Sequence, residues 1–200
     1  MADQPPTDDL HRLPTDEEFS RLQWTTVLYY LHETNPDNGL VRDKTEPNAP
    51  CSIAAVGLAL ATFPVIVERG VVIRKFAAKI ARRRLRHLFE LPQGPEPDAA
   101  GYKGFYYHFL DIDTGRRVWQ CELSTLDSAF LFAGMLTAAT CFDQDTAEEH
   151  EIRTLADALY RRAAGRRPAN LDAATGRVGG GEGNPLAGAY DEPRPAASEP

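Results

Sequence analysis

The stretch Ile53–Val67, IAAVGLALATFPVIV, decides how the rest of this sequence is interpreted. It runs for 15 residues, interrupted only by Thr62 and Pro64, whereas a membrane-spanning helix needs about 20 apolar residues. The stretch therefore predicts a helix that is buried on most sides in a protein core. Ser52 suits the N-cap of this helix and Gly70 its end, and Pro64, which lacks a backbone N–H, predicts a kink.

Four more helices are predicted on either side of this one. Thr15 followed by Glu18 is a capping-box pattern, and apolar residues at helical spacing extend from it over residues 16–33. A basic amphipathic helix follows over 72–90, and two further helices are expected over 124–141 and 146–162. The basic face of helix 72–90 could dock on nucleic acid, but a solvated face is the simpler interpretation because the chain as a whole is acidic.

One short β-hairpin is expected between the third and fourth helices. Residues 105–110 alternate as FYYHFL, which is a strand pattern, and the turn residues Asp113-Thr114-Gly115 follow. Residues 118–121 would return as the second strand. The fold class is therefore mainly all-α, with helix pairs joined by variable loops, as in a bundle or a toroid.

Composition excludes several classes of protein. The chain has 22 basic and 29 acidic residues and a net charge of −7, which argues against generic binding to nucleic acid or to an anionic membrane. Three cysteines without CxxC spacing predict neither a structural zinc site nor a disulfide scaffold, and they suit a reducing compartment. The first nine residues contain no basic segment followed by an apolar one, so no export signal is recognised and a cytoplasmic location is expected.

The two ends of the chain differ from its middle. Residues 165–200 contain 7 Gly, 5 Pro and 7 Ala, and such a segment buries too little apolar surface to offset the entropy lost on ordering. We expect residues 1–14 and 163–200 to be disordered and residues 15–162 to form the folded domain.

Residues 101–127 concentrate the groups that could carry chemistry. Aromatic rings alternate there with carboxylates and arginines, an arrangement that suits a sugar-binding cleft, although aromatic hairpins also pack into cores. Glycoside hydrolysis needs two carboxyl groups that flank the scissile bond. Glu122 and Asp127 would lie about 140° apart on one helix, so they do not form such a pair. On spacing alone, Glu122 is better interpreted as a surface acid at a strand end, whereas Asp127 is equally well interpreted as a capping partner of Ser124.

Five motifs in this order resemble the glycoamylase-like family, which is similar to endo-β-1,2-glucanases and to the transglycosylase domain of cyclic β-1,2-glucan synthases. They are Gly39–Asp43 (GLVRD), Ser52–Gly57 (SIAAVG), Gly94–Pro97 (GPEP), Gly101–Asp111 (GYKGFYYHFLD) and Cys121–Asp127 (CELSTLD). The resemblance implies an (α/α)6 toroid that acts on β-glucan without a metal or other cofactor. It implies that Glu122 is one catalytic carboxylate, as base or nucleophile, and that the sugar cleft is lined by Tyr106, His108, Trp119 and Asp127.

The resemblance also predicts an incomplete domain. In similar proteins more helices follow, and they supply the second catalytic carboxylate, whereas here a Gly/Ala/Pro-rich segment begins near residue 163. A truncation or a shifted reading frame would explain that change. Five helices cannot close a twelve-helix ring, so apolar helix faces should be exposed and available for association. Hydrolysis by the chain alone should be negligible; the alternatives are a non-catalytic glucan-binding module and a helical interaction protein.

Overall fold

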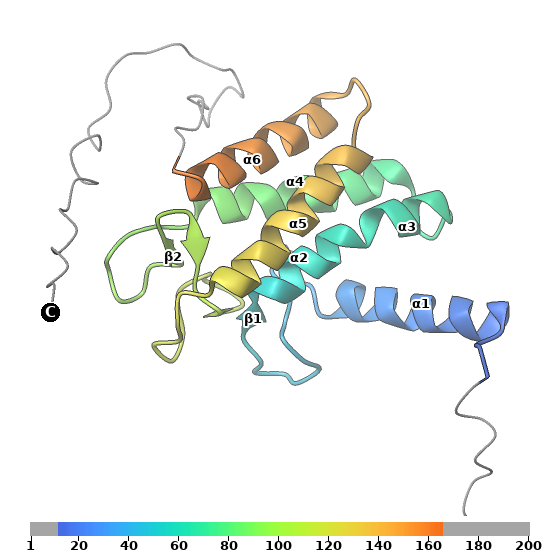
Figure 1. Cartoon of the computed structure of the whole chain (residues 1–200), viewed down its shortest axis with the longest axis horizontal. Coiled ribbons are helices and arrows are strands. Elements are labelled where there is room, and N and C mark those ends of the chain that lie inside the picture. The colour runs from blue at the N-terminus through green and yellow to red at the C-terminus, as the bar shows by residue number, and fades with distance from the viewer. Residues whose placement is uncertain (1–11, 166–200) are drawn as a thin grey trace, which may run out of the picture. The chain divides into compact units, whose positions relative to one another are not determined.

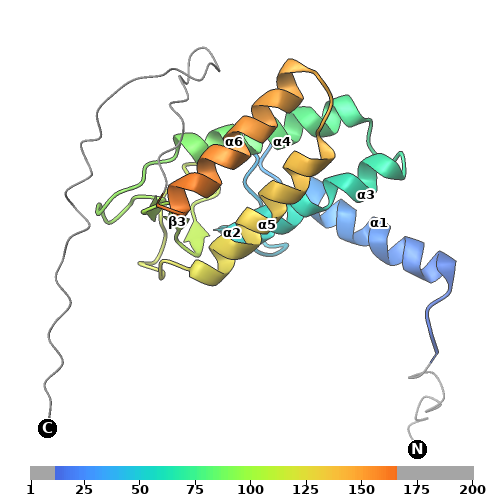
Figure 2. The same cartoon turned by 45° about the horizontal axis from the view of Figure 1, so that its top comes forward.

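The computed structural model describes residues 12–165, so the disorder expected for residues 1–14 and 163–200 lies outside this range except at residues 12–14 and 163–165. The described part is mainly helical, with two-residue strands between the helices (Figures 1 and 2). No helix in this range is both long and apolar enough to cross a bilayer. The helices are α1 (Asp16–His32), α2 (Ile53–Ala61), α3 (Phe63–Glu68), α4 (Arg74–Glu90), α5 (Thr125–Cys141) and α6 (Ala147–Ala163).

The apolar stretch forms α2 and α3, with the chain turning between them. Thr62 caps both helices, and its hydroxyl donates a hydrogen bond to the Ala59 carbonyl at 2.8 Å. Pro64 lies in the first turn of α3, where a backbone N–H has no helical partner in any case. The kink expected at this proline is thus confirmed, as a break that divides one predicted helix into two.

The core is centred on α5, which packs between α2 and α6, while α4 packs against α6 (Figures 1 and 2). The contact between α2 and α5 is close because each helix presents a glycine to the other. A Cβ built on Gly134 would lie 1.9 Å from the Gly57 carbonyl oxygen, and one built on Gly57 would lie 2.3 Å from the Phe130 carbonyl oxygen. Around this crossing Leu60, Leu131 and Met135 are fully buried.

The short hairpin is confirmed, but its strands differ from those expected. β2 (Gly101–Tyr102) pairs with β3 (Phe105–Tyr106) through a turn at Lys103 and Gly104, whose φ angles are +51° and +87°. Two consecutive positive φ values are those of a tight two-residue hairpin turn. β4 (Phe109–Leu110) pairs instead with β1 (Cys51–Ser52). The pairing expected between residues 105–110 and 118–121 is present only in part, because no regular second strand forms there. Isolated bridges join Leu110 to Arg117 and Tyr107 to Leu123, and the Val118 N–H donates to the Phe109 carbonyl at 3.3 Å.

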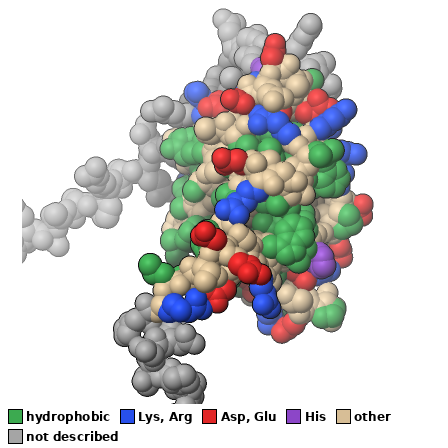
Figure 3. Space-filling view, turned by 90° about the vertical axis from the view of Figure 1, so that its right-hand side faces the viewer, with side chains coloured by type: hydrophobic (Ala, Val, Ile, Leu, Met, Phe, Trp, Pro, Cys, Tyr) green, Lys and Arg blue, Asp and Glu red, His purple; other side chains and the backbone are tan. Residues whose placement is uncertain are grey.

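Large apolar side chains are exposed on several helices and are most numerous on α1 and α5, as expected for unpartnered helix faces. On α1 only Val27 is buried, and the apolar residues on the outer side of α5 also face solvent. Figure 3 shows hydrophobic side chains gathered on one face of the molecule. The exposed residues of these two helices are Phe19, Leu22, Trp24 and Leu31 on α1 and Leu126, Phe130 and Leu136 on α5.

Candidate functional site

The candidate site forms where the chain around β4 runs beside the segment that leads into α5. The Glu122 carbonyl accepts a hydrogen bond from the His108 backbone N–H at 3.0 Å, and the Tyr106 carbonyl accepts one from the Ser124 N–H at 3.1 Å. These bonds fix the register of the two segments. As a result His108 and Glu122, which are 14 residues apart in the sequence, have adjacent side chains.

His108 lies close to two carboxylates, one near each of its ring nitrogens. Its Nδ1 lies 2.8 Å from Glu122 Oε1, and its Nε2 lies 3.7 Å from Asp127 Oδ2. A carboxylate can only accept, so the short contact is a hydrogen bond donated by His108 Nδ1–H. The structure therefore brings together three of the five residues expected to form the site, with Glu122 the most exposed of them.

Asp127 has two roles in this arrangement. Ser124 is the N-cap of α5, and its hydroxyl oxygen accepts a hydrogen bond from the Asp127 backbone N–H at 3.1 Å. The same hydroxyl donates a hydrogen bond to the Asp127 carboxylate. The capping interpretation of this pair is thus confirmed, and it coexists with the contact to His108. The positive end of the α5 dipole also favours negative charge here.

Glu122 is poised to be ionised. Hydrogen bonds from its own backbone N–H and from His108 hold the pKa of its carboxyl below the usual value. Its side chain is 66% exposed, so a ligand in solvent can reach it. A carboxyl group with a lowered pKa suits a base or a nucleophile, whereas a general acid needs a raised pKa.

Trp119 stands beside this cluster on a strained loop. It is 74% exposed, its ring meets Phe109 edge-on at 5.7 Å between centroids, and Phe109 stacks on His108. Trp119 and Gln120 have φ angles of +56° and +53°, a left-handed conformation that side chains disfavour. Strain of this kind persists only where surrounding contacts hold it, and it is common at binding sites.

Arg117 supplies those surrounding contacts. Its Nε donates to the Cys121 carbonyl at 2.7 Å and its Nη2 to the Gln120 carbonyl at 2.8 Å. Its guanidinium also lies over the Tyr107 ring, 3.9 Å from the centroid. In the sequence, Arg117 is one of several polar residues in this segment and stands out only because it lies two residues before Trp119. Its contacts with the loop backbone depend on how the loop folds, so they could not be predicted from the sequence.

Tyr106 does not join the other four residues. It is 1% exposed, and its hydroxyl donates a hydrogen bond to the Leu88 carbonyl at 2.7 Å. Burial raises the pKa of this phenol to about 12. In this structure Tyr106 ties β3 to α4 beneath the site, where its ring is closed to a ligand.

The same three side chains are also of the kinds that bind metal ions. One ligand atom from each of His108, Glu122 and Asp127 lies within 4.8 Å of the others. However, Glu122 is hydrogen-bonded to His108 Nδ1 and the Asp127 carboxylate to the Ser124 hydroxyl, so both acids have partners without an ion. The arrangement is therefore accounted for as a histidine hydrogen-bonded to a carboxylate.

No family model matches the sequence. The chain is 27% identical over 154 residues to an exo-β-1,2-glucooligosaccharide sophorohydrolase, acting at the non-reducing end, from Parabacteroides distasonis. The chain resembles glucoamylase-like proteins. The match covers 74% of this chain and 20% of the sophorohydrolase, so the chain spans about a fifth of that relative.

Solved structures place the fold in the same group. A candidate glucoamylase from Bacteroides uniformis superposes with a TM-score of 0.64 at 26% identity, covering 76% of this chain and 37% of that one. An endo-β-1,2-glucanase from Chitinophaga pinensis, solved with sophorotriose and glucose, gives a TM-score of 0.64 at 18% identity over 76% and 37% of the two chains. The second likeness shows the fold alone. Over about three quarters of its length, this chain thus resembles part of a glucoamylase-like protein in fold.

Proposed function

We propose that residues 12–165 form the glucan-binding part of a β-glucan-acting glycoside hydrolase or transglycosylase, with Glu122 as its base or nucleophile. The observation that carries the proposal is the juxtaposition of an exposed, ionised carboxylate with an exposed tryptophan on a clamped loop. The indole of Trp119 offers a flat apolar face to the C–H side of a sugar ring. The name of the sophorohydrolase relative supports a β-1,2-linked glucan as the ligand.

In this proposal each residue of the site has a task. Glu122 accepts a proton from water or attacks the anomeric carbon, and the His108 Nδ1–H bond at 2.8 Å orients its carboxylate. The Asp127 carboxylate, 3.7 Å from His108 Nε2, adds a second negative charge beside the histidine. Trp119 holds a neighbouring sugar unit. Tyr106, buried beneath them, supports the floor of the site.

We further propose that the chain alone has negligible hydrolytic activity. Hydrolysis needs a second carboxyl group on the far side of the glycosidic bond. Asp127 does not meet this need because its carboxylate accepts a hydrogen bond from the Ser124 hydroxyl and its side chain is only 15% exposed. The acid must then come from outside residues 12–165.

Calorimetry with linear β-1,2-glucooligosaccharides tests the binding part of this proposal. We expect saturable binding that Trp119→Ala weakens by about tenfold or more. Trp24→Ala is the matched control, because Trp24 is also partly exposed but lies on α1, and it should leave the affinity unchanged. Absence of saturable binding, or equal effects of the two substitutions, would refute the assignment of this site.

An assay of reducing ends and transfer products on the same glucan tests the catalytic part. We expect no turnover above that of a Glu122→Gln variant. Turnover that Glu122→Gln abolishes, while Glu17→Gln on α1 does not, would show that the chain is a complete catalyst and that the second carboxyl group lies within it. Glu17 is a suitable control because it is an exposed acid in the first turn of α1.

The exposed apolar faces of α1 and α5 support a second candidate function, that of a helical interaction protein. This alternative predicts association that depends on protein concentration and no affinity for glucan. Sedimentation of the parent protein and of a Leu22→Asp, Leu126→Asp double variant separates it from glucan binding. A monomeric parent protein that binds glucan would exclude the alternative.

A further inference from the structure

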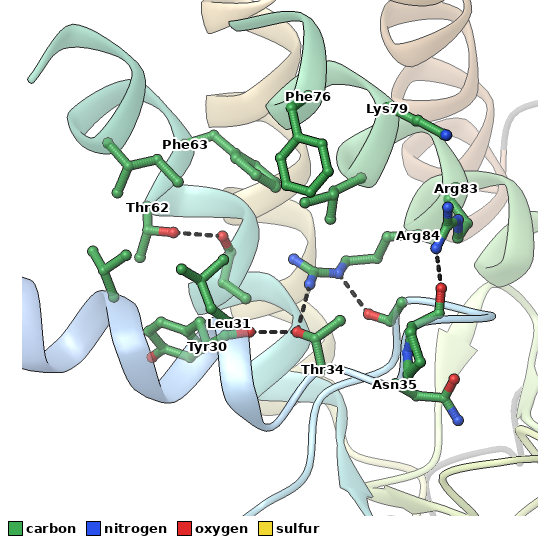
Figure 4. A pocket seen from close by; sticks show the side chains of 16 residues that line it. Tyr30, Leu31, Thr34, Asn35, Thr62, Phe63, Phe76, Lys79, Arg83 and Arg84 are labelled. Carbon is green, nitrogen blue, oxygen red and sulfur yellow. Dashed lines mark hydrogen bonds between the residues drawn. The ribbon is translucent and has the colours of Figure 1, made fainter. Parts of the chain in front are cut away.

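A cavity of about 370 Å³ lies between α1, α3, α4 and the turn that follows α1 (Figure 4). Its walls are mainly apolar, and they include the side chains of Leu31, Phe63 and Phe76. Lys79 and Arg83 also line it, whereas none of its 16 lining residues is acidic. None of these residues belongs to the candidate glucan site, so the cavity is a separate feature of the molecule.

Arg84 lines this cavity with an incompletely paired guanidinium. The residue is 2% exposed. Its Nε donates to the Gly39 carbonyl at 2.6 Å and its Nη2 to the Thr34 hydroxyl at 3.1 Å, whereas its Nη1 is buried without a hydrogen-bond partner. Among residues 12–165 no carboxylate forms an ion pair with Arg84. A buried cation is normally paired, because an unmatched donor and an unmatched charge both cost free energy.

The guanidinium is held firmly in this position. Gly39 adopts a φ of +82°, and a Cβ built there would lie 3.0 Å from the Arg84 Cβ. The glycine therefore lets the turn approach α4 closely enough for its carbonyl to accept from Arg84. Burial lowers the pKa of Arg84 to about 10, so the group remains a cation at neutral pH. The site is in this sense preorganised for an anion.

Apolar side chains line the cavity next to this cation. The guanidinium carbon lies 5.9 Å from the Phe63 ring centroid, and Figure 4 shows Phe63 and Phe76 on the side of the cavity opposite Thr34. A ligand that fits has one anionic group at Arg84 and an uncharged chain or ring against the phenylalanines. A carboxylate matches a guanidinium in charge and in planar geometry.

We propose that this cavity binds a small apolar monocarboxylate, whose carboxylate accepts a hydrogen bond from Arg84 Nη1 and whose hydrocarbon part packs against Phe63 and Phe76. Such a ligand completes the hydrogen bonding of Arg84 and fills an apolar space that the described residues leave open. The proposal is independent of glucan binding, because the two sites share no residue.

Octanoate and its uncharged analogue octanamide test the proposal on the parent protein. Both are titrated at low millimolar concentrations by calorimetry, and intermolecular NOEs between the ligand and the protein locate the bound octanoate. We expect saturable binding of octanoate, at least tenfold weaker binding of octanamide, and NOEs from the octanoate methylenes to the rings of Phe63 and Phe76. Equal affinities, no binding of octanoate, or NOEs to other residues would overturn the proposal.

Arg84→Gln and Arg86→Gln provide the matched variants. Arg86 lies on the same helix, but it pairs with Glu151 at the surface and does not line the cavity. We expect Arg84→Gln to abolish the preference for octanoate over octanamide and Arg86→Gln to retain it. If Arg84→Gln does not fold, as circular dichroism would show, the comparison of the two ligands on the parent protein still decides. An excess of β-1,2-glucooligosaccharide should leave the octanoate affinity unchanged, so the failure of either site can be recognised separately.

Discussion

Gly134→Ala perturbs the crossing of α2 and α5, on which the core depends. The added methyl carbon would lie 1.9 Å from the carbonyl oxygen of Gly57 and 2.8 Å from its Cα. These atoms belong to the backbone of the facing helix, so no side chain can rotate away to make room. The two helices must move apart, and the buried side chains around the crossing then lose contacts.

The expected loss follows from two opposing contributions. Overpacking a well-filled core costs about 1–3 kcal/mol, and the upper end applies here because backbone opposes the new methyl group. Alanine in a helix interior is favoured over glycine by about 1 kcal/mol. The free energy of unfolding should therefore fall by about 2 kcal/mol, which is roughly a thirtyfold change in the folding equilibrium.

Urea unfolding followed by circular dichroism measures this loss. Ala133→Gly on the exposed side of α5 is the control, since it reports the helix-propensity contribution at the neighbouring position. Gly57→Ala should also destabilise, and the double variant should lose less than the sum of the two single losses, because both methyl groups occupy the same crossing. If Gly134→Ala proves as stable as the parent protein or more stable, the close crossing is refuted.

Two further predictions concern buried polar groups. Glu149 is 3% exposed and receives two hydrogen bonds from Arg74, at 2.8 and 2.7 Å, which hold the pKa of its carboxyl below the usual value. A carboxyl with a lowered pKa stabilises the fold above its unfolded-state pKa of about 4.3, and this stabilisation is lost as pH falls through the folded value. Glu149→Gln should therefore lower the free energy of unfolding by about 2 kcal/mol at pH 7 and make its decline between pH 5 and 3 shallower; a decline identical to that of the parent protein would contradict this. Tyr106→Phe should cost about 1 kcal/mol, because it removes the bond to the Leu88 carbonyl, and calorimetry should show no change in glucan affinity; a large loss of affinity would instead place this ring in the binding site.

The helices could be predicted because their limits are encoded locally. The capping box formed by Thr15 and Glu18 is present at the start of α1, and Ser124 caps α5 through the Asp127 backbone. Pro64 marks the break between α2 and α3. In each case the signal lies within four residues of the boundary, so no knowledge of distant parts of the chain was needed.

The strand pairing could not be predicted from local signals. The alternation over residues 105–110 is real, since Tyr106 and Leu110 are buried. The partner of each strand, however, depends on a left-handed residue at Lys103 and on the distant strand β1, which pairs with β4. The positive φ of Lys103 could not be predicted from the sequence, because lysine seldom adopts that conformation.

For the site residues, too, the local pattern could be predicted but their accessibility to a ligand could not. Tyr106 and His108 have the same parity along the strand, and a two-residue period places them on one face. Tyr106 is buried because it lies under α5, where its backbone N–H donates to the Ser128 hydroxyl. His108 lies at the start of that helix, beside Asp127 in its first turn. Tyr106 is therefore covered by α5 and His108 is not, so only His108 can reach a ligand. The two-residue period of the strand does not reveal this difference.

The candidate site is built from the ends of elements whose caps also stabilise the fold. The Ser124 cap that starts α5 orients Asp127, the paired segments place His108 beside Glu122, and Arg117 holds the loop that presents Trp119. All of these contacts lie within residues 12–165. If this surface binds sugar as proposed, folding of this part therefore suffices to preorganise it. Catalysis needs in addition a carboxyl group on the opposite side of the bound sugar, so binding and turnover should be separable properties of this chain.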